Sequence, residues 1–81
     1  MEVRYSKSAL KALLRSNKRK LIVQKITDLA ATPVASNPNV TKLVGRDEYR
    51  LRVQDWRVIF QVDGMILDIR YIGPRSTIYQ E

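Results

Sequence analysis

Apolar and polar residues alternate at the start of the chain and then take up a helical period. Residues 1–5 alternate strictly, which predicts a strand. Ser6 is a suitable N-cap, because its side-chain oxygen can accept from a backbone N–H of the first turn, and we expect a helix over residues 7–15. The apolar stripe of this helix consists of three leucines at helical spacing, Leu10, Leu13 and Leu14.

A second helix is predicted over residues 18–31, after a break at Asn17. It ends before Pro33, since a residue that precedes proline disfavours the helical region. The apolar stripe of this helix contains Leu21, Ile22, Ile26, Leu29 and Ala30. Residues 33–39 are rich in Pro, Ser and Asn and read as a connector, so the two helices should form a hairpin.

The period returns to two in the second half of the chain. This pattern predicts three strands, over residues 49–53, 56–62 and 65–72. Turn signals separate or end them at Gln54-Asp55, Asp63-Gly64 and Gly73-Pro74. Residues 75–81 are expected to add a short edge.

The element order is therefore β-α-α-β-β-β, in one α+β domain that spans residues 1–81. An antiparallel sheet should carry the two-helix hairpin on one face, because both helical stripes must be buried. The apolar parity sets of the sheet face the helices: Tyr49, Leu51 and Val53, with Trp56, Val58, Phe60 and Val62 on the next strand.

The composition excludes several kinds of enzyme. Among its 81 residues the chain has no cysteine and no histidine, so disulfides, thiolate metal sites and the commonest general base are missing. A zinc hydrolase or a Ser-His triad enzyme is excluded, and we expect no cofactor and no metal. No apolar run approaches the roughly 20 residues that span a bilayer, and the N-terminus lacks a signal-peptide pattern. The expected location is the cytoplasm, without membrane contact.

The charge points to a polyanionic partner. Fifteen Lys and Arg against eight Asp and Glu give a net charge of +7, a large surplus for so small a protein. Many of the bases lie in the helical half, at Lys7, Lys11, Arg15, Lys18, Arg19, Lys20 and Lys25. A merely solvated helix face is the alternative to an RNA-binding surface.

A second basic set lies on the predicted sheet. Parity puts Arg50 and Arg52 on the face away from the helices, and Arg57 joins them if the first two strands pair around residues 54–55. Three guanidinium groups at that range repel each other unless an anion binds, and phosphate matches the arginine fork. Strands also often carry solvent-facing arginines paired with acids, and parity alone does not exclude this. The acids available for such pairs are Asp47, Glu48, Asp55 and Asp68.

Several short blocks of the sequence resemble the RelE/ParE toxin superfamily. They occur in the family's order, in the second half of the chain: Lys42–Gly45, Tyr49–Val53, Asp55–Val62, Ile72–Arg75 and Ile78-Tyr79. The resemblance implies the same strand and helix order that the periodicity predicts. RelE toxins cut messenger RNA in the ribosomal A site and are held inactive by an antitoxin, whereas ParE toxins share the fold and poison DNA gyrase.

The resemblance also implies a set of site residues. The basic pair, the two later arginines and the tyrosine of the RelE cutting site correspond to Arg50, Arg52, Arg57, Arg75 and Tyr79. The best-known RelE has lysines at the basic pair, and arginine is a poor general base because it stays protonated. The resemblance therefore favours a ribosome-dependent mRNA endonuclease. A gyrase inhibitor and a plain RNA- or ribosome-binding module remain the alternatives.

Overall fold

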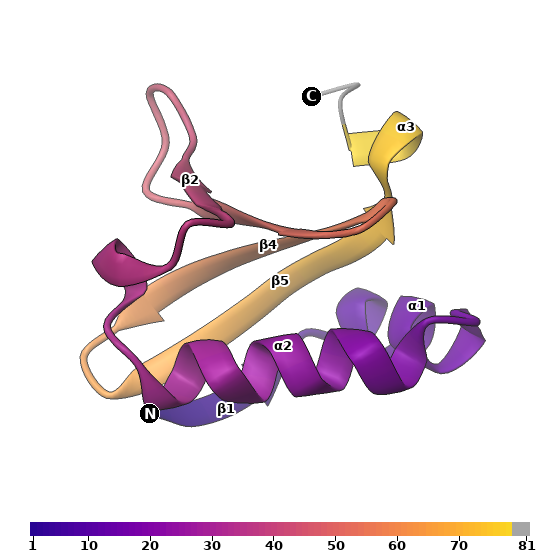
Figure 1. Ribbon diagram of the computed structural model, residues 1–81, viewed down its shortest axis with the longest axis horizontal. Helices are drawn as coiled ribbons and strands as arrows, with labels where there is room; N and C mark the ends of the chain where they lie inside the picture. The colour runs from indigo at the N-terminus through magenta and orange to yellow at the C-terminus, as the bar shows by residue number, and fades with distance from the viewer. Residues whose placement is uncertain (79–81) are drawn as a thin grey trace.

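Two helices lie along one side of a curved five-stranded sheet (Figure 1). The computed structural model describes residues 1–78, and their side chains through residue 76. The strands are β1 (Glu2–Tyr5), β2 (Val40–Lys42), β3 (Tyr49–Val53), β4 (Trp56–Asp63) and β5 (Ile66–Pro74). The helices are α1 (Lys7–Arg15), α2 (Arg19–Ala31), the 3-10 turn η1 (Val34–Ser36) and the short α3 (Arg75–Ile78).

The strand order is β1-β5-β4-β3-β2, so the α+β prediction with the helices on one face is confirmed. The sheet is mixed rather than wholly antiparallel, because β1 pairs parallel with β5. The helices carry the chain from one edge strand to the other, and β2 to β5 then alternate in direction across the sheet. That alternation brings β5 beside β1 in the same direction.

Strand β2 is absent from the sequence-based prediction. It has three residues, too few to display a period, and it exists through pairing with β3, where Val40 faces Leu51 and Lys42 faces Tyr49. The predicted edge over residues 75–81 is also wrong for its described part, because Arg75–Ile78 forms α3.

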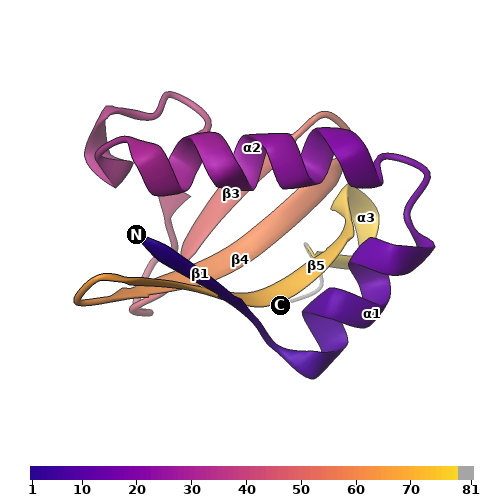
Figure 2. The same ribbon diagram turned by 90° about the horizontal axis from the view of Figure 1, so that it is seen from below.

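Helix α1 begins and ends where the capping pattern predicts. The Ser6 hydroxyl oxygen accepts a hydrogen bond from the Ala9 N–H at 3.0 Å and donates one to the Arg70 carbonyl at 2.7 Å. The cap therefore satisfies the first turn and also fixes the helix to β5. Figure 2 shows α1 lying near β5 while α2 crosses over β3 and β4.

The buried face of α1 differs from the predicted leucine stripe. Ala9 and Leu13 are buried, whereas Leu10 and Leu14 are 45% and 58% exposed. Alanine has no side chain beyond Cβ, so the helix approaches the sheet most closely along the Ala9–Leu13 ridge. The prediction chose the leucines because they are the most hydrophobic residues of the helix. The ridge that is buried is instead the one that allows the helix to lie close to the sheet.

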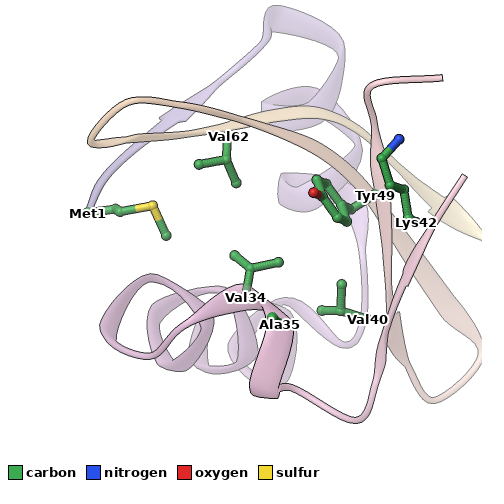
Figure 3. A pocket seen from close by; sticks show the side chains of 7 residues that line it. All are labelled: Met1, Val34, Ala35, Val40, Lys42, Tyr49 and Val62. Carbon is green, nitrogen blue, oxygen red and sulfur yellow. The ribbon is translucent and has the colours of Figure 1, made fainter.

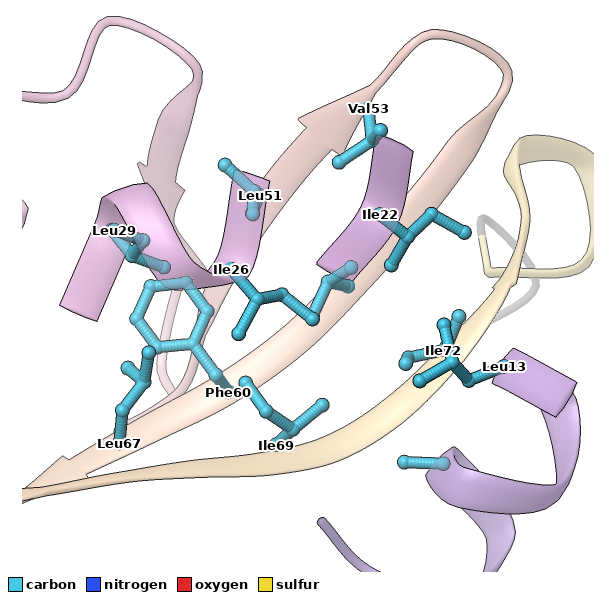
Figure 4. Packing of buried hydrophobic residues seen from close by; sticks show 12 residues of the cluster. Leu13, Ile22, Ile26, Leu29, Leu51, Val53, Phe60, Leu67, Ile69 and Ile72 are labelled. Atoms are coloured by element: carbon cyan, nitrogen blue, oxygen red, sulfur yellow. The ribbon is translucent and has the colours of Figure 1, made fainter. Parts of the chain in front are cut away.

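Helix α2 buries the predicted stripe against the sheet. Ile22, Ile26 and Leu29 pack over β3 to β5, where Phe60 is fully buried (Figure 4). The Phe60 ring stacks on that of Tyr49, with ring centroids 5.4 Å apart. The rest of the core comes mainly from the strands and α1, namely Ala9, Leu13, Leu51, Val53, Val58, Leu67, Ile69 and Ile72.

Both tight hairpins turn through a residue with positive φ. Gln54 has φ 53° in the turn between β3 and β4, and Gly64 has φ 59° in the turn between β4 and β5. This backbone conformation suits two-residue hairpin loops, because it matches the right-handed twist of the flanking strands. The second loop consists of Gly64 and Met65, one residue later than predicted.

A β-bulge in β5 reverses the parity of that strand. Ile59 pairs with Tyr71 and Phe60 pairs with Ile69, so Arg70 is an extra residue without a partner position on β4. Before the bulge Ile69 faces the helices, and after it Ile72 takes that place. Tyr71 is consequently on the opposite face of the sheet.

Candidate functional site

The face of the sheet away from the helices carries two rows of residues across the strands. One row runs from β2 to β5 through Thr41, Arg50, Ile59 and Tyr71. The next row contains Arg52, Arg57 and Gly73. Arg50, Arg52 and Arg57 therefore share one face, as strand parity predicts.

A small polar hollow lies on this face. Its volume is about 140 Å³, enough for a few water molecules or a compact anion. It is lined by Pro38, Asn39, Thr41, Arg50, Arg52 and Arg57. The three arginines that were predicted to share this face thus line a single concave site, which we call the arginine hollow.

The connector before β2 positions Arg52. The Asn37 side chain accepts from the Asn39 N–H at 2.9 Å and fixes the backbone there. The Asn39 side chain in turn accepts from the Arg52 guanidinium at 3.1 Å, and the Arg52 N–H donates to the Asn39 carbonyl at 2.9 Å. The side chain of Arg52 stays exposed while its direction is held.

The side chain of Arg57 is buried and hydrogen-bonded, which strand parity alone does not predict. Only 5% of the residue is exposed, and its guanidinium donates to the Gln54 carbonyl at 2.7 Å and to the Trp56 carbonyl at 2.9 Å. The side chain curls back over the turn between β3 and β4 instead of extending into solvent. Truncating it would leave these carbonyls without their donor, so Arg57→Ala should lose stability as well as charge.

Two of the four acids that might have paired with the arginine hollow have other partners. Glu48 pairs with Arg46, and Asp68 pairs with Arg70 at 3.4 Å. Arg52 has no carboxylate partner among residues 1–76. Within the described part of the chain, therefore, Arg52 is not a surface arginine paired with an acid.

The remaining residues of the predicted cutting site lie near the same end of the sheet or outside the described residues. Arg75 opens α3, and its N–H donates to the Asp55 carbonyl at 2.7 Å, which ties α3 to the turn between β3 and β4. The exposed side chain of Arg75 does not line the arginine hollow. Tyr79 lies outside the residues that the structure describes.

The basic residues of the helical half form a separate surface. Lys7, Lys11 and Arg15 are spaced by four residues on α1, and all three are exposed. Lys18, Arg19 and Lys20 are exposed at the turn into α2, and Lys25 is half-buried. Because α1 and α2 cover the other face of the sheet (Figure 1), this set and the arginine hollow lie on different sides of the molecule.

A larger cavity of about 510 Å³ lies on the helix side and is mostly apolar (Figure 3). It is lined by Met1, Val34, Ala35, Val40, Lys42, Tyr49 and Val62. Its polar groups are the lysine and tyrosine side chains, and the Lys42 ammonium lies 5.8 Å from the centre of the Tyr49 ring. This cavity has no converging set of polar groups, so the chemistry points to the arginine hollow.

Sequence reasoning missed Tyr71. In the sequence it continues the parity of the core residues Leu67 and Ile69, which predicts a buried side chain. The bulge at Arg70 places it instead on the face of the arginine hollow, where it is 37% exposed. No single-sequence signal marks this bulge.

Among the residues that the structure describes, the site contains cations and hydroxyls but no strong general base. Guanidinium groups bind and stabilise phosphate charge, and they stay protonated at any physiological pH. In the described residues no cluster of His, Cys, Asp or Glu is placed to hold a metal ion. Within the same residues no helix is both long and apolar enough to cross a membrane. Far from the hollow, on β1, burial raises the pKa of Tyr5 above its ordinary value of 10.0.

Comparison with known proteins identifies the family. Residues 3–79 match the family of ParE toxins of type II toxin–antitoxin systems. The archaeal RelE in its complex with RelB from Pyrococcus horikoshii is 30% identical and superposes with a TM-score of 0.77, covering 91% of this chain and 93% of that chain. Among the curated proteins no sequence matches.

Two bacterial structures support the fold. RelE in the intact RelBE toxin–antitoxin complex of E. coli is 21% identical, with a TM-score of 0.73 over 90% of this chain and 94% of that chain. The isolated E. coli RelE toxin is 22% identical, with a TM-score of 0.74 over 98% of this chain and 90% of that chain. Together with the family match, these likenesses assign the chain to the RelE/ParE superfamily, as a toxin of a type II toxin–antitoxin system.

Proposed function

We propose that this toxin is an endoribonuclease that cuts messenger RNA on the ribosome. The observation that carries the proposal is the convergence of Arg50, Arg52 and Arg57 on one polar hollow of phosphate size. Arginine binds phosphate through two parallel hydrogen bonds, and a fixed guanidinium needs no reorganisation when charge develops. Those properties suit a site that bends and polarises an RNA backbone.

The proposed reaction transfers the scissile phosphoryl group to the neighbouring 2′-hydroxyl. The 2′ oxygen attacks phosphorus and the bond to the 5′ oxygen breaks. The products are a 2′,3′-cyclic phosphate and a free 5′-hydroxyl. The 2′-hydroxyl loses its proton to solvent or to a base, and the leaving oxygen gains one. Because the chain has no histidine, catalysis rests on positioning and electrostatics more than on proton transfer.

Each site residue has a proposed role. Arg57 clamps the scissile phosphate, since its guanidinium is already fixed over the turn. Arg50 and Arg52 hold and bend the backbone on either side. Arg75 stabilises charge on the leaving oxygen or the phosphate, and Tyr79 stacks a base or moves a proton. Removal of one such donor typically lowers a rate by about 10²–10³.

The partners proposed are the ribosomal A site, the mRNA and a protein antitoxin. The exposed basic residues of α1 and of the turn into α2 supply the contact with ribosomal RNA. An acidic antitoxin is supported by the +7 charge and by the relatives solved as RelE–RelB complexes. If no small acidic protein co-purifies with the chain from cells that carry its flanking genes, the antitoxin assignment is wrong. All of these partners place the proposed activity in the cytoplasm.

The alternative is a gyrase inhibitor that cuts nothing. It is favoured by one observation, the match of residues 3–79 to the ParE toxins. A gyrase inhibitor acts by contact with another protein, so its function would not depend on a phosphate site. The two proposals therefore predict different effects of a substitution in the arginine hollow, which should impair an endonuclease but not a gyrase inhibitor.

The test uses purified chain, ribosomes and a defined mRNA placed in the A site. Wild type should cut the message and leave a cyclic phosphate, and a message with a 2′-deoxy sugar at the cut should resist. Arg52→Gln should lower the rate by about 10²–10³, and Arg57→Lys should do the same while keeping a cation. Arg4→Gln, on the edge strand β1, is the matched control and should cut normally. Full activity of both hollow variants would rule out the arginine hollow as the cutting site.

A further inference from the structure

Tyr71 reaches toward the arginine row because Gly73 has no side chain. A Cβ added to Gly73 would lie 3.2 Å from Cε2 and 3.4 Å from the hydroxyl oxygen of Tyr71. The ring therefore occupies the space where the side chain of the next residue on that face would stand. Gly73 is in register with Arg57 on β4, so the ring lies over the row of residues to which that arginine belongs.

The exposure of Tyr71 has no structural explanation in the core. The residue is 37% exposed and does not belong to the hydrophobic cluster between helices and sheet. Its row neighbour Ile59 is buried on the same face, with Arg50 on its other side. The face of the sheet opposite α1 and α2 thus carries arginines on β3 and β4 and an aromatic ring on β5, in neighbouring rows.

We propose that Tyr71 stacks a nucleobase of single-stranded RNA whose phosphate binds in the arginine hollow. The inference rests on the proposed function and adds a base-binding residue to it. Unstacked bases bind to the faces of aromatic side chains, and stacking tolerates every base because each has a π-face. One strand spacing, about 4.8 Å, separates β5 from the strand of Arg57, so one nucleotide can contact both residues.

The test compares two ligands that differ only in the nucleoside, inorganic phosphate and adenosine 3′-monophosphate. NMR titration of the full chain measures both affinities. Wild type should bind the nucleotide more tightly than phosphate, and ligand ring current should shift the Tyr71 ring protons. Tyr71→Ala should lose about 5- to 100-fold in nucleotide affinity and keep its phosphate affinity. Tyr71→Phe should keep both, because the ring and not the hydroxyl carries the stacking.

Two further variants separate stacking from damage to the fold. Gly73→Ala should shift the ring by a few tenths of an ångström and weaken nucleotide binding although Tyr71 and the arginines are all present, since the added methyl group would lie 3.2 Å from the ring. Met65→Ala, 75% exposed in the turn between β4 and β5, should change neither affinity. Melting curves identify any variant that is unfolded.

The outcomes distinguish the two proposals. If wild type binds phosphate but Tyr71→Ala binds the nucleotide as tightly as wild type does, the stacking inference is overturned and the endonuclease proposal stands. If wild type prefers the nucleotide and Tyr71→Ala loses that preference, the inference is supported. If wild type binds neither ligand, the arginine hollow is not a phosphate site and both proposals are overturned.

Discussion

Arg52 and Arg57 stand directly opposite each other on neighbouring strands, on the same face of the sheet. Side chains paired in this way have Cβ atoms about 4.5–5.5 Å apart, and like charges there oppose folding. The hydrogen bonds to Asn39 and to the turn carbonyls hold both guanidinium groups in place in spite of this repulsion. An anion that binds between them would relieve it, so we expect the arginine hollow to bind phosphate.

The pair predicts that phosphate stabilises the folded chain. The melting temperature of wild type should rise with phosphate concentration at constant ionic strength, as for any ligand that binds only the native state. Arg52→Gln should melt at the same or a higher temperature without phosphate, because a repulsion of about 0.2–1 kcal/mol is removed. The phosphate-dependent rise should then be lost, whereas Arg4→Gln should keep it. An equal rise in all three proteins would mean that phosphate acts elsewhere.

Strand parity was sufficient to place the three arginines on one face, because the side chains of a strand alternate whatever the tertiary structure. It could not predict that Arg57 curls back onto the turn, since that depends on where two backbone carbonyls point after the hairpin closes. Nor could it predict the face of Tyr71, because the extra residue Arg70 is set by pairing with β4. Both differences arise from contacts between strands.

Among the elements, helix α1 shows which features follow from neighbouring residues and which depend on tertiary contacts. The Ser6 cap and the polar break after Arg15 fix its bounds from neighbouring residues alone, and the prediction of those bounds is correct. Which ridge is buried depends on the sheet beneath, and there the small Ala9 determines the contact. Strand β2 is the extreme case, because it is too short for any period and exists through its partner strand.

Adjacent leucines on α1 provide a matched test of this packing. Leu13 is 4% exposed and Leu14 is 58% exposed. Leu13→Ala should reduce the free energy of unfolding by about 2–5 kcal/mol, since it removes a buried side chain and leaves a cavity. Leu14→Ala should change it by no more than about 0.5 kcal/mol. Denaturant unfolding of both variants measures the difference, and equal losses would mean that α1 packs through a different face.

For the whole molecule, the main consequence of the fold is that basic residues face outward on both sides. The arginine hollow lies on the face of the sheet opposite α1 and α2, and the basic residues of α1 and the turn into α2 lie on the helix side. A net charge of +7 on a body with principal extents of 28 × 26 × 23 Å gives a positive field over much of the surface. The proposed ribosome contact uses the helix side while the hollow engages mRNA.

Because the two basic surfaces are separate, we expect the affinity for ribosomes to fall with salt concentration. This salt dependence should come mainly from the helix side and not from the arginine hollow. Each phosphate that Lys or Arg neutralises contributes about −0.7 to −0.9 to the log–log slope of affinity against salt. Replacing Lys18, Arg19 and Lys20 together with Gln should flatten the slope by up to about 2 to 3. Arg52→Gln should change the slope by no more than about 1. Ribosome co-sedimentation across a salt series measures both, and an unchanged slope in the triple variant would leave the helix side as a solvated face.

Primer extension on a reporter mRNA, after the toxin is induced in cells, tests whether the chain cuts mRNA through the arginine hollow. Wild type should produce discrete cuts within the translated frame, and Arg52→Gln, expressed at the same level, should not. Chromosomal DNA from the same cells should remain without double-strand breaks. Intact mRNA together with double-strand breaks after induction of wild type would contradict the claim and establish the gyrase-directed alternative.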